Sequence, residues 1–257
     1  MIQSRIAYNT LLGKLLRLPL ALIPRTTTVR ILRGLLRGKK WIVGAGMHSY
    51  WLGTFEAEKQ KILLENIKDG FVFYDLGAHT GYYSLQASML VGKGGMVYAF
   101  EPNPRNISYL KQHFAINKIE NVSIVEFAVG DHDGNIPFAL GNSSFVGHIS
   151  QDGDINVKIL SLDSSVARGD FKKPDFVKID VEGAELSVLK GARSILRKYH
   201  PHLLLSLHSR ELLTTCLAFL ESFNYKAINL DNGPIENSKE LFLTYKTPSI
   251  SQDKLVK

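Results

Sequence analysis

From about residue 55 onward, apolar and polar positions alternate between two kinds of segment. Short continuous apolar runs are flanked by turn-forming residues, and longer stretches between them repeat apolar residues every three or four positions. The first pattern is typical of strands buried on both faces, and the second of amphipathic helices. Strands that alternate with helices predict an α/β fold with a doubly wound, mostly parallel sheet.

The two patterns predict where each element lies along the chain. Strands are expected at residues 71–74, 96–100, 122–127, 175–179 and 203–207. Helices are expected at residues 55–67, 82–90, 105–117, 184–196 and 210–223. These elements belong to a body that we expect to span residues 51–248, followed by a frayed tail at residues 249–257.

One segment of the body departs from the alternation of strands and helices. Residues 131–163 contain four glycines and two short β-like runs, at 135–139 and 156–160. Asp152-Gly153, between these runs, is a hairpin-type dipeptide. We therefore expect a small antiparallel insertion here, on which acceptor specificity would depend.

Charge separates the first residues from the body. The chain carries a formal net charge of +7, but residues 1–40 hold nine lysines and arginines and no acidic residue, so the remainder sums to +7 − 9 = −2. We expect a basic helical extension over residues 1–50, with two short helices broken near Pro24. Apolar residues on one face of the second helix suit either a lid packed on the body or a helix lying on an anionic membrane surface.

The segment near the start is too short to cross a membrane. Its longest apolar run, 18–24, falls well below the roughly 20 residues that a span requires, and no small-residue cleavage site follows it. The location expected from this is cytoplasmic, with peripheral attachment to a membrane surface as a second option. Cys216, the single cysteine, excludes an internal disulfide.

The first predicted strand runs into a glycine loop that precedes a helix. This loop, Asp75-Leu76-Gly77-Ala78-His79-Thr80-Gly81, would let a ligand approach the backbone and the helix amino terminus. It lacks the Gly-Lys-Ser/Thr of a P-loop and the spacing of the dinucleotide glycine motif. Asp75 would repel a phosphate but would attract a cationic ligand that carries an amino group and a sulfonium.

The second predicted strand ends in an acidic residue, Glu101, twenty positions after Gly81. A carboxylate at this strand tip can accept hydrogen bonds from both ribose hydroxyls of an adenosine. NAD would suit Glu101 but not the first loop. The two features together favour S-adenosylmethionine as the cofactor.

A third polar segment surrounds the end of the fourth predicted strand. Asp180 follows this strand, where the carboxyl edge of a doubly wound sheet faces the ligand crevice, and Lys178 points to the same side. Glu182 and Glu185 lie at the start of the next helix, where acidic residues commonly compensate the helix dipole. Asp180 has no comparable packing role, so we expect it to be functional.

With these motifs in order, the chain resembles the FkbM family of methyltransferases from about residue 52 to residue 210. The matching pieces are Leu52-Gly53-Thr54-Phe55-Glu56, the loop from Asp75 to Gly81, Phe100-Glu101-Pro102-Asn103 and Lys178-Ile179-Asp180-Val181-Glu182-Gly183-Ala184-Glu185. The resemblance implies a class I, Rossmann-like fold and an S-adenosylmethionine-dependent enzyme. It also implies O-methylation of a hydroxyl on a sugar, glycan or secondary metabolite.

The resemblance also implies which residues form the site. The expected cofactor-binding residues are Asp75, Gly77, Ala78, His79, Thr80, Gly81, Tyr82, Glu101, Pro102, Asn103, Ala128 and Asp180. The expected catalytic residues are Asp180, His208, Lys178 and Glu182. One position departs from the family pattern, because relatives usually carry a glutamate two residues before the histidine, and Ser206 stands there in this chain.

Two mechanisms suit these residues. In the first, His208 is the general base, with a pKa near neutrality, and Asp180 orients it or binds the acceptor. In the second, Asp180, Glu182 and His208 hold a divalent metal ion that lowers the pKa of the hydroxyl.

Other function classes stay open from the sequence. A nucleic-acid or other N-methyltransferase is disfavoured, because the segment 180–183 lacks the Asn/Asp-Pro-Pro-aromatic motif. An NAD oxidoreductase is disfavoured by the first loop. A non-catalytic membrane-surface protein that retains the cofactor fold is a further alternative, because of Ser206.

Overall fold

The computed structural model describes residues 20, 22–141, 147–231 and 233–246. They fall into two compact units, one ending at Phe55 and one beginning at Glu56. The division lies slightly beyond residue 50, where the sequence predicted the end of an extension. The expected tail at residues 249–257 lies outside the described residues.

The larger unit is built around a seven-stranded sheet with the order β12-β13-β11-β10-β3-β4-β5. Its strands are β3 (Val72–Leu76), β4 (Met96–Phe100), β5 (Val122–Val125), β10 (Phe176–Ile179), β11 (His202–Ser206), β12 (Tyr225–Asn229) and β13 (Glu240–Tyr245). The five neighbouring strands β5, β4, β3, β10 and β11 are parallel to one another, whereas β13 runs antiparallel to both of its neighbours, β11 and β12. The predicted doubly wound, mostly parallel sheet is confirmed.

The register of the parallel strands aligns their carboxyl ends. Leu76 pairs with Phe100 on one side and with Ile179 on the other, and Ile179 pairs with Leu205. The residue after each of these positions therefore lies on one edge of the sheet. These residues are Gly77, Glu101, Asp180 and Ser206.

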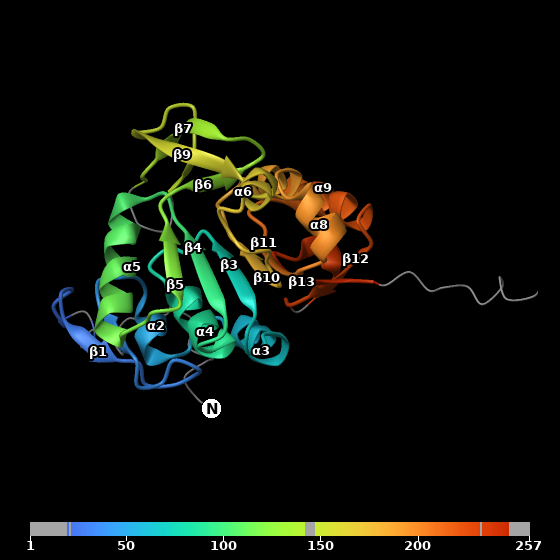
Figure 1. Ribbon diagram of the computed structural model, residues 1–257. Helices are drawn as coiled ribbons and strands as arrows, with labels where there is room; N and C mark the ends of the chain where they lie inside the picture. The colour runs from blue at the N-terminus through green and yellow to red at the C-terminus, as the bar shows by residue number, and fades with distance from the viewer. Residues whose placement is uncertain (1–19, 21, 142–146, 232, 247–257) are drawn as a thin grey trace, which may run out of the picture. The chain divides into compact units, whose positions relative to one another are not determined.

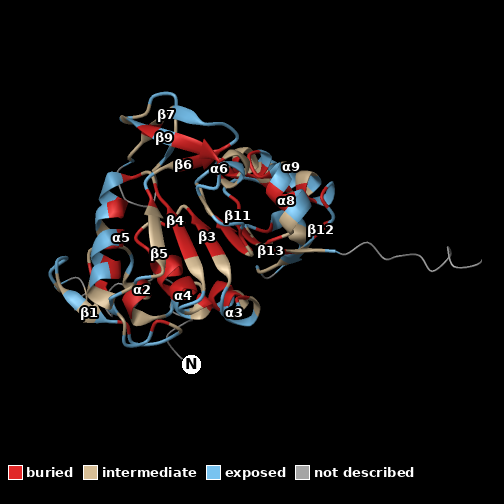
Figure 2. Cartoon of the chain, in the orientation of Figure 1, coloured by how far each residue is buried: buried red, intermediate tan, exposed pale blue. Residues whose placement is uncertain are grey.

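Helices pack on the sheet and supply the rest of the core. They are α3 (Ala57–Asn66), α4 (Tyr82–Val91), α5 (Pro104–Asn117), α6 (Leu162–Arg168), α7 (Glu185–Lys190), α8 (Arg193–Tyr199) and α9 (Arg210–Glu221). Figure 1 shows α3, α4 and α5 around β3, β4 and β5, and α8 and α9 beside the other half of the sheet. Buried residues concentrate on the central strands and on the helix faces turned toward them (Figure 2).

The single helix predicted over residues 184–196 is two helices, α7 and α8. Gly191 lies between them, and a Cβ atom there would be 1.9 Å from the carbonyl oxygen of Gly130. The carbonyl oxygen of Gly191 accepts hydrogen bonds from the backbone of Asp163 (2.8 Å) and from Ser161 Oγ (3.0 Å). These tertiary contacts interrupt the helix, and the local hydrophobic period does not reveal them.

The predicted antiparallel insertion forms a small second sheet with the order β6-β9-β7-β8. Its strands are β6 (Ala128–Gly130), β7 (Gly134–Ala139), β8 (His148–Ile149) and β9 (Ile155–Ser161). β7 is antiparallel to β8 and β9, and a small apolar cluster that includes Phe138 and Ile159 packs beneath them. Because β6 follows β5 closely, this sheet lies beyond the carboxyl edge of the central sheet (Figure 1).

The smaller unit corrects one prediction. The helix expected around residues 30–40 is wrong, because β1 (Thr28–Arg30) pairs with β2 (Lys40–Ile42) in an antiparallel hairpin. Gly34 and Gly38 adopt positive φ angles of 74° and 86°, which favour a turn over a helix. A short helix, α2 (His48–Leu52), follows.

The other expected helix of the extension, before Pro24, lies almost wholly outside the described residues. Within the described parts of the chain, no helix has the length and hydrophobicity needed to cross a bilayer.

Candidate active site

Asp75, at the tip of β3, is fully buried and its charge is satisfied inside the protein. Its Oδ1 atom lies 3.0 Å from Lys178 Nζ, and its Oδ2 atom accepts a hydrogen bond of 2.6 Å from Ser84 Oγ. The sequence suggested that Asp75 meets a cationic ligand directly. In the structure the cation that it meets is Lys178.

Lys178 joins the loops that follow β3 and β10. Its buried ammonium group donates to the carbonyl oxygen of Gly77 (2.9 Å) and lies 3.8 Å from Asp180 Oδ2. Burial alone lowers the pKa of Lys178, but the carboxylates of Asp75 and Asp180 outweigh that effect and raise it above its usual value. Lys178 is therefore a permanent cation that holds the two loops in place.

Gly77 allows these two loops to touch. It has a positive φ of 74°, and a Cβ atom on it would lie 1.8 Å from the backbone oxygen of Asp180. The sequence suggested that glycine is needed here for a ligand to approach. The structure gives a further reason, because a backbone oxygen of the protein occupies that space.

The rest of the first loop is also held by the protein. The amide groups of Gly77 and Ala78 both donate to the carbonyl oxygen of Phe100, over 3.0 and 2.9 Å. Thr80 is buried, and its carbonyl oxygen lies 2.7 Å from His113 Nδ1. Gly81 then caps the amino terminus of α4, the helix that begins with Tyr82.

Glu101, after β4, binds the first loop from the other side. Its Oε2 atom accepts from the backbone of His79 (2.8 Å), and its Oε1 atom accepts from the backbone of Asn103 (2.9 Å) and from Asn106 Nδ2 (3.2 Å). Burial raises the pKa of Glu101 to about 7, although these hydrogen bonds act in the opposite direction. A carboxylate has about four lone-pair positions, so Glu101 retains capacity for one more donor.

Two other predicted cofactor residues, Asn103 and Ala128, have contacts within the protein. Pro102 leads from Glu101 to Asn103, which caps α5 by accepting a hydrogen bond of 3.0 Å from the backbone of Arg105. Ala128 lies in β6, where it packs in the apolar cluster of the small sheet. The side chain of Ala128 is therefore used in packing within the small sheet.

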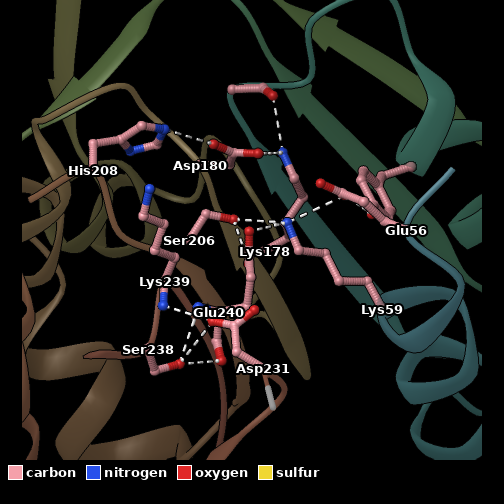
Figure 3. Close-up of polar contacts among 12 residues, drawn as sticks. Glu56, Lys59, Lys178, Asp180, Ser206, His208, Asp231, Ser238, Lys239 and Glu240 are labelled. Carbon is pink, nitrogen blue, oxygen red and sulfur yellow. Dashed lines mark hydrogen bonds and ion pairs between the residues drawn. The ribbon is translucent and has the colours of Figure 1, made fainter. Parts of the chain in front are cut away.

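Asp180 and His208 come together from the neighbouring strands β10 and β11. His208 Nε2 lies 3.6 Å from Asp180 Oδ1 and 3.3 Å from Glu182 Oε2 (Figure 3 shows the first pair). His208 Nδ1 lies 2.8 Å from Oε1 of Glu185, a fully buried carboxylate. Glu185 therefore orients the imidazole ring and leaves Nε2 at the partly exposed side.

The surrounding carboxylates change the protonation of His208. Glu182 and Glu185 raise its pKa to about 10, against the smaller effect of burial. The sequence predicted a base with a pKa near neutrality. The site instead holds His208 as an imidazolium cation at neutral pH, so it must lose a proton before it can act as a base.

Three side chains of this site also offer ligands for a metal ion. Asp180, Glu182 and His208 each contribute one donor atom, and these atoms all lie within 4.8 Å of one another. Carboxylate oxygens and an imidazole nitrogen suit Mn²⁺ or Zn²⁺, and a buried carboxylate on the other ring nitrogen is typical of metal-binding histidines. An imidazolium cation satisfies the same carboxylates without a metal.

Lys59 and Glu240 were missed from the sequence. Lys59, on α3, is buried and forms ion pairs with Glu240 (2.8 Å) and Glu56 (3.2 Å), and it donates to Ser206 Oγ over 3.0 Å. Ser206 in turn donates to Glu240 Oε2 over 3.0 Å. Glu240, on β13, thus places a carboxylate next to Ser206. Ser206 is the position at which the family resemblance led us to expect an acid.

Comparison with known proteins agrees with this architecture. The family model of the methyltransferase FkbM domain matches residues 75–227. A solved structure of a methyltransferase FkbM from Methylobacillus flagellatus superposes with a TM-score of 0.50 at 18% identity, covering 77% of this chain and 53% of that one. At this identity the structural likeness concerns the fold alone.

Two curated relatives are similar over part of their length. The chain is 31% identical over 144 residues to the hexuronic acid methyltransferase AglP of Haloferax volcanii, a match that covers 55% of this chain and 58% of AglP. It is 24% identical over 147 residues to the 2-O-methyltransferase NoeI of Sinorhizobium fredii, covering 49% and 59%. The chain therefore spans less than two thirds of either relative.

Proposed function

Because the chain belongs to the FkbM methyltransferase family, we propose that it transfers the methyl group of S-adenosylmethionine to a hydroxyl of a sugar or glycan. The observation that carries the proposal is the contact between the Gly77 loop and Asp180, with His208 beside them. Cofactor-binding and acceptor-facing groups thereby share one edge of the sheet, where ligands of doubly wound folds bind.

The cofactor site in this proposal lies between the first loop and Glu101. The remaining acceptor position of the Glu101 carboxylate suits a ribose hydroxyl, and the start of α4 suits the methionine part. Asp75 and Lys178 act from behind, since both are buried and paired with each other. The bound cofactor supplies an electrophilic methyl group on a sulfonium.

Methyl transfer is an in-line displacement, so the protein mainly positions the acceptor oxygen and removes its proton. Asp180 and His208 are both partly exposed and can face the acceptor hydroxyl. We assign proton acceptance to His208 Nε2 after it has lost its own proton. The acceptor hydroxyl then takes the place of Glu182 at this nitrogen, while Glu185 keeps the ring oriented.

A sugar acceptor is supported by the names of the relatives. One is named for a hexuronic acid and the other for a 2-O-position. The first name refers to a sugar acid and the second to methylation of an oxygen, and together they support a hydroxyl of a sugar as the acceptor.

The proposal is tested by separating binding from transfer. Calorimetry should detect S-adenosylmethionine binding by the intact protein, and Glu101→Gln should weaken it by roughly 1.5–3 kcal/mol, the value of one hydrogen bond to a charged group. Asp180→Asn and His208→Gln should keep cofactor affinity but lower methyl transfer to a panel of glycosides, by roughly 10²–10⁴-fold for His208. Near-full transfer by His208→Gln across pH 6–9 would contradict the base assignment.

A further inference from the structure

The basic side chains around Asp180 are more deeply buried than most of the acidic ones. The side chains of the two lysines, Lys59 and Lys178, are only 4% and 3% exposed. Three carboxylates at this edge are more open: Asp180 is 29% exposed, Glu182 40% and Glu240 24%, whereas Asp75 is fully buried against Lys178. A ligand that approaches this edge therefore meets these carboxylates and the partly exposed His208, and the two ammonium groups lie behind them.

Glu240 is the carboxylate of this group that lies on β13. Its Oε1 atom pairs with Lys59 over 2.8 Å, and its Oε2 atom accepts from Ser206 Oγ over 3.0 Å (Figure 3). Ser206 and Glu240 are direct register partners on β11 and β13. The backbone amide of Glu240 also donates to Asp231 Oδ2 over 3.1 Å. The carboxylate is thus fixed in place from the side chain and from the backbone.

This fixed carboxylate has acceptor capacity left. An ionised carboxylate offers about four lone-pair positions and no donor, and the described contacts of Glu240 use two of them. Its open side can therefore accept hydrogen bonds from hydroxyl groups. A carboxylate or phosphate of the ligand placed against Glu240 would be repelled by it, whereas a hydroxyl there can donate to it.

Glu240 lies close to the reactive groups. Its partner Ser206 ends β11, two residues before His208, and Lys59 is one of the cations that lower the pKa of Asp180. Since β13 is the next strand beyond β11, the carboxylate stands beside the proposed methylation site on the side away from the cofactor loop.

We propose that Glu240 is an acceptor-binding residue that receives a hydrogen bond from a second hydroxyl of the acceptor. The acceptor class is a neutral, hydroxyl-rich ring such as an uncharged hexose, in preference to a ring that carries a carboxylate. This inference rests on the proposed function. It deepens it by naming what the surface next to Asp180 recognises.

The test compares two acceptors that differ in one group. Methyl transfer by the full chain would be measured with p-nitrophenyl glucoside and p-nitrophenyl glucuronide, using isotopically labelled S-adenosylmethionine. The wild type should prefer the glucoside in kcat/KM. Glu240→Gln should raise KM for the glucoside roughly tenfold, as expected for one lost charge-assisted hydrogen bond, with cofactor affinity unchanged.

A matched control separates local from general charge effects. Glu221 is exposed at the far end of α9, so Glu221→Gln makes the same charge change away from the site and should leave both KM values unaltered. If Glu240→Gln does not fold, Glu240→Asp keeps the charge and withdraws the carboxylate by one methylene. A folded Glu240→Asp should also show a raised KM.

Several results would overturn the inference. These are a wild-type preference for the glucuronide, an unchanged KM in folded Glu240 variants, or cofactor binding without use of any neutral glycoside. Failure to bind S-adenosylmethionine at all is a different outcome, because it removes the proposed function and this inference with it. Calorimetry distinguishes that case before any acceptor is added.

Discussion

At the scale of single residues, contact between the two loops of the site depends on the missing side chain of Gly77. The residue adopts a left-handed φ of 74°, and the nearest backbone atom would lie 1.8 Å from an added Cβ. Both features disfavour any other amino acid, one through backbone strain and one through collision.

Gly77→Ala should therefore destabilise the fold by at least about 1–3 kcal/mol and separate the first loop from Asp180. We expect a lower midpoint of denaturant unfolding together with weaker S-adenosylmethionine binding. Gly169→Ala is the control, because Gly169 has a similar positive φ of 82° but nothing within 4 Å of its Cβ position. Equal effects of the two substitutions on cofactor affinity would show that the contact with Asp180 does not matter.

Protonation of His208 is also decided by individual neighbours, of which Glu182 raises its pKa most. Glu182→Gln should lower the pKa of His208 from about 10 toward 6.5 and shift the alkaline rise of the methyl-transfer rate to lower pH. Titration of the labelled imidazole by NMR measures the first effect, and a pH–rate profile measures the second. A profile that stays in place while the imidazole pKa falls would exclude His208 as the base.

The raised pKa of His208 also determines how its contribution to the stability of the fold changes with pH. The folded value of about 10 exceeds the ordinary value of 6.5. The ion pairs of His208 therefore stabilise the fold fully below about pH 6.5, and this contribution is lost as pH rises through 10.

The imidazolium form bears on metal dependence. It already places a positive charge between Asp180 and Glu182, so we expect chelators to leave activity and thermal stability unchanged. Activity abolished by EDTA and restored by Mg²⁺ or Mn²⁺ would contradict this. The three side chains would then be metal ligands, and the metal would take over the role of the proton.

At the scale of elements, the small sheet β6–β9 has its own apolar cluster. Phe138, at 5% exposure, packs there with Val157 and Ile159, and Gly153 fits against the backbone beside it. The cluster is separate from the large core beneath the central sheet. β6 and β9 also contribute Val129 and Leu160 to that core, so β7 and β8 are the strands that can loosen without loss of the carboxyl edge of the central sheet.

Phe138→Ala should cost about 3–5 kcal/mol within the small sheet. Hydrogen exchange should accelerate for β7 and β8 while the amides of β3, β4 and β10 keep their protection. If the small sheet shapes the acceptor site, KM for the acceptor should rise with little change in cofactor affinity. Uniformly faster exchange across both sheets would show instead that they unfold as one element.

At the scale of the whole molecule, every strand of the central and small sheets lies after Glu56. The hairpin β1–β2 belongs to the preceding unit, and a cut after residue 40 would pass through β2. The sequence predicted an extension over residues 1–50, and the structure moves the useful boundary for a truncation to the junction of Phe55 and Glu56.

A chain that begins at Glu56 should therefore unfold cooperatively and bind S-adenosylmethionine with nearly unchanged affinity. Circular dichroism with thermal melting and calorimetry measure the two properties. An aggregated or molten product would show that the first unit is needed for the fold. Loss of salt-dependent binding to anionic vesicles in an otherwise sound truncation would assign that binding to the basic residues before Glu56.

Much of the fold could be predicted from the sequence, because its signals are local. The apolar runs of β3, β4 and β10 and the glycines between strand and helix report on burial and turns within a few residues. They placed Glu101, Asp180 and His208 at strand ends, and a parallel sheet brings such ends to one edge. The prediction of a helix around residues 30–40 was wrong, because the apolar residues around the turns at Gly34 and Gly38 have the same spacing as the apolar face of a helix.

Other features were decided only by the tertiary structure. Three of these features involve residues far apart in the chain. They are the ion pair of Asp75 with Lys178, the effect of Glu182 and Glu185 on the pKa of His208, and the ion pair of Lys59 with Glu240. They depend on which strands are neighbours and on how deeply each charge is buried, since both set the strength of an electrostatic contact. The sequence by itself therefore determined the family, the order of elements and the edge expected to carry the site, whereas burial and strand order decided which charges pair and which stay exposed.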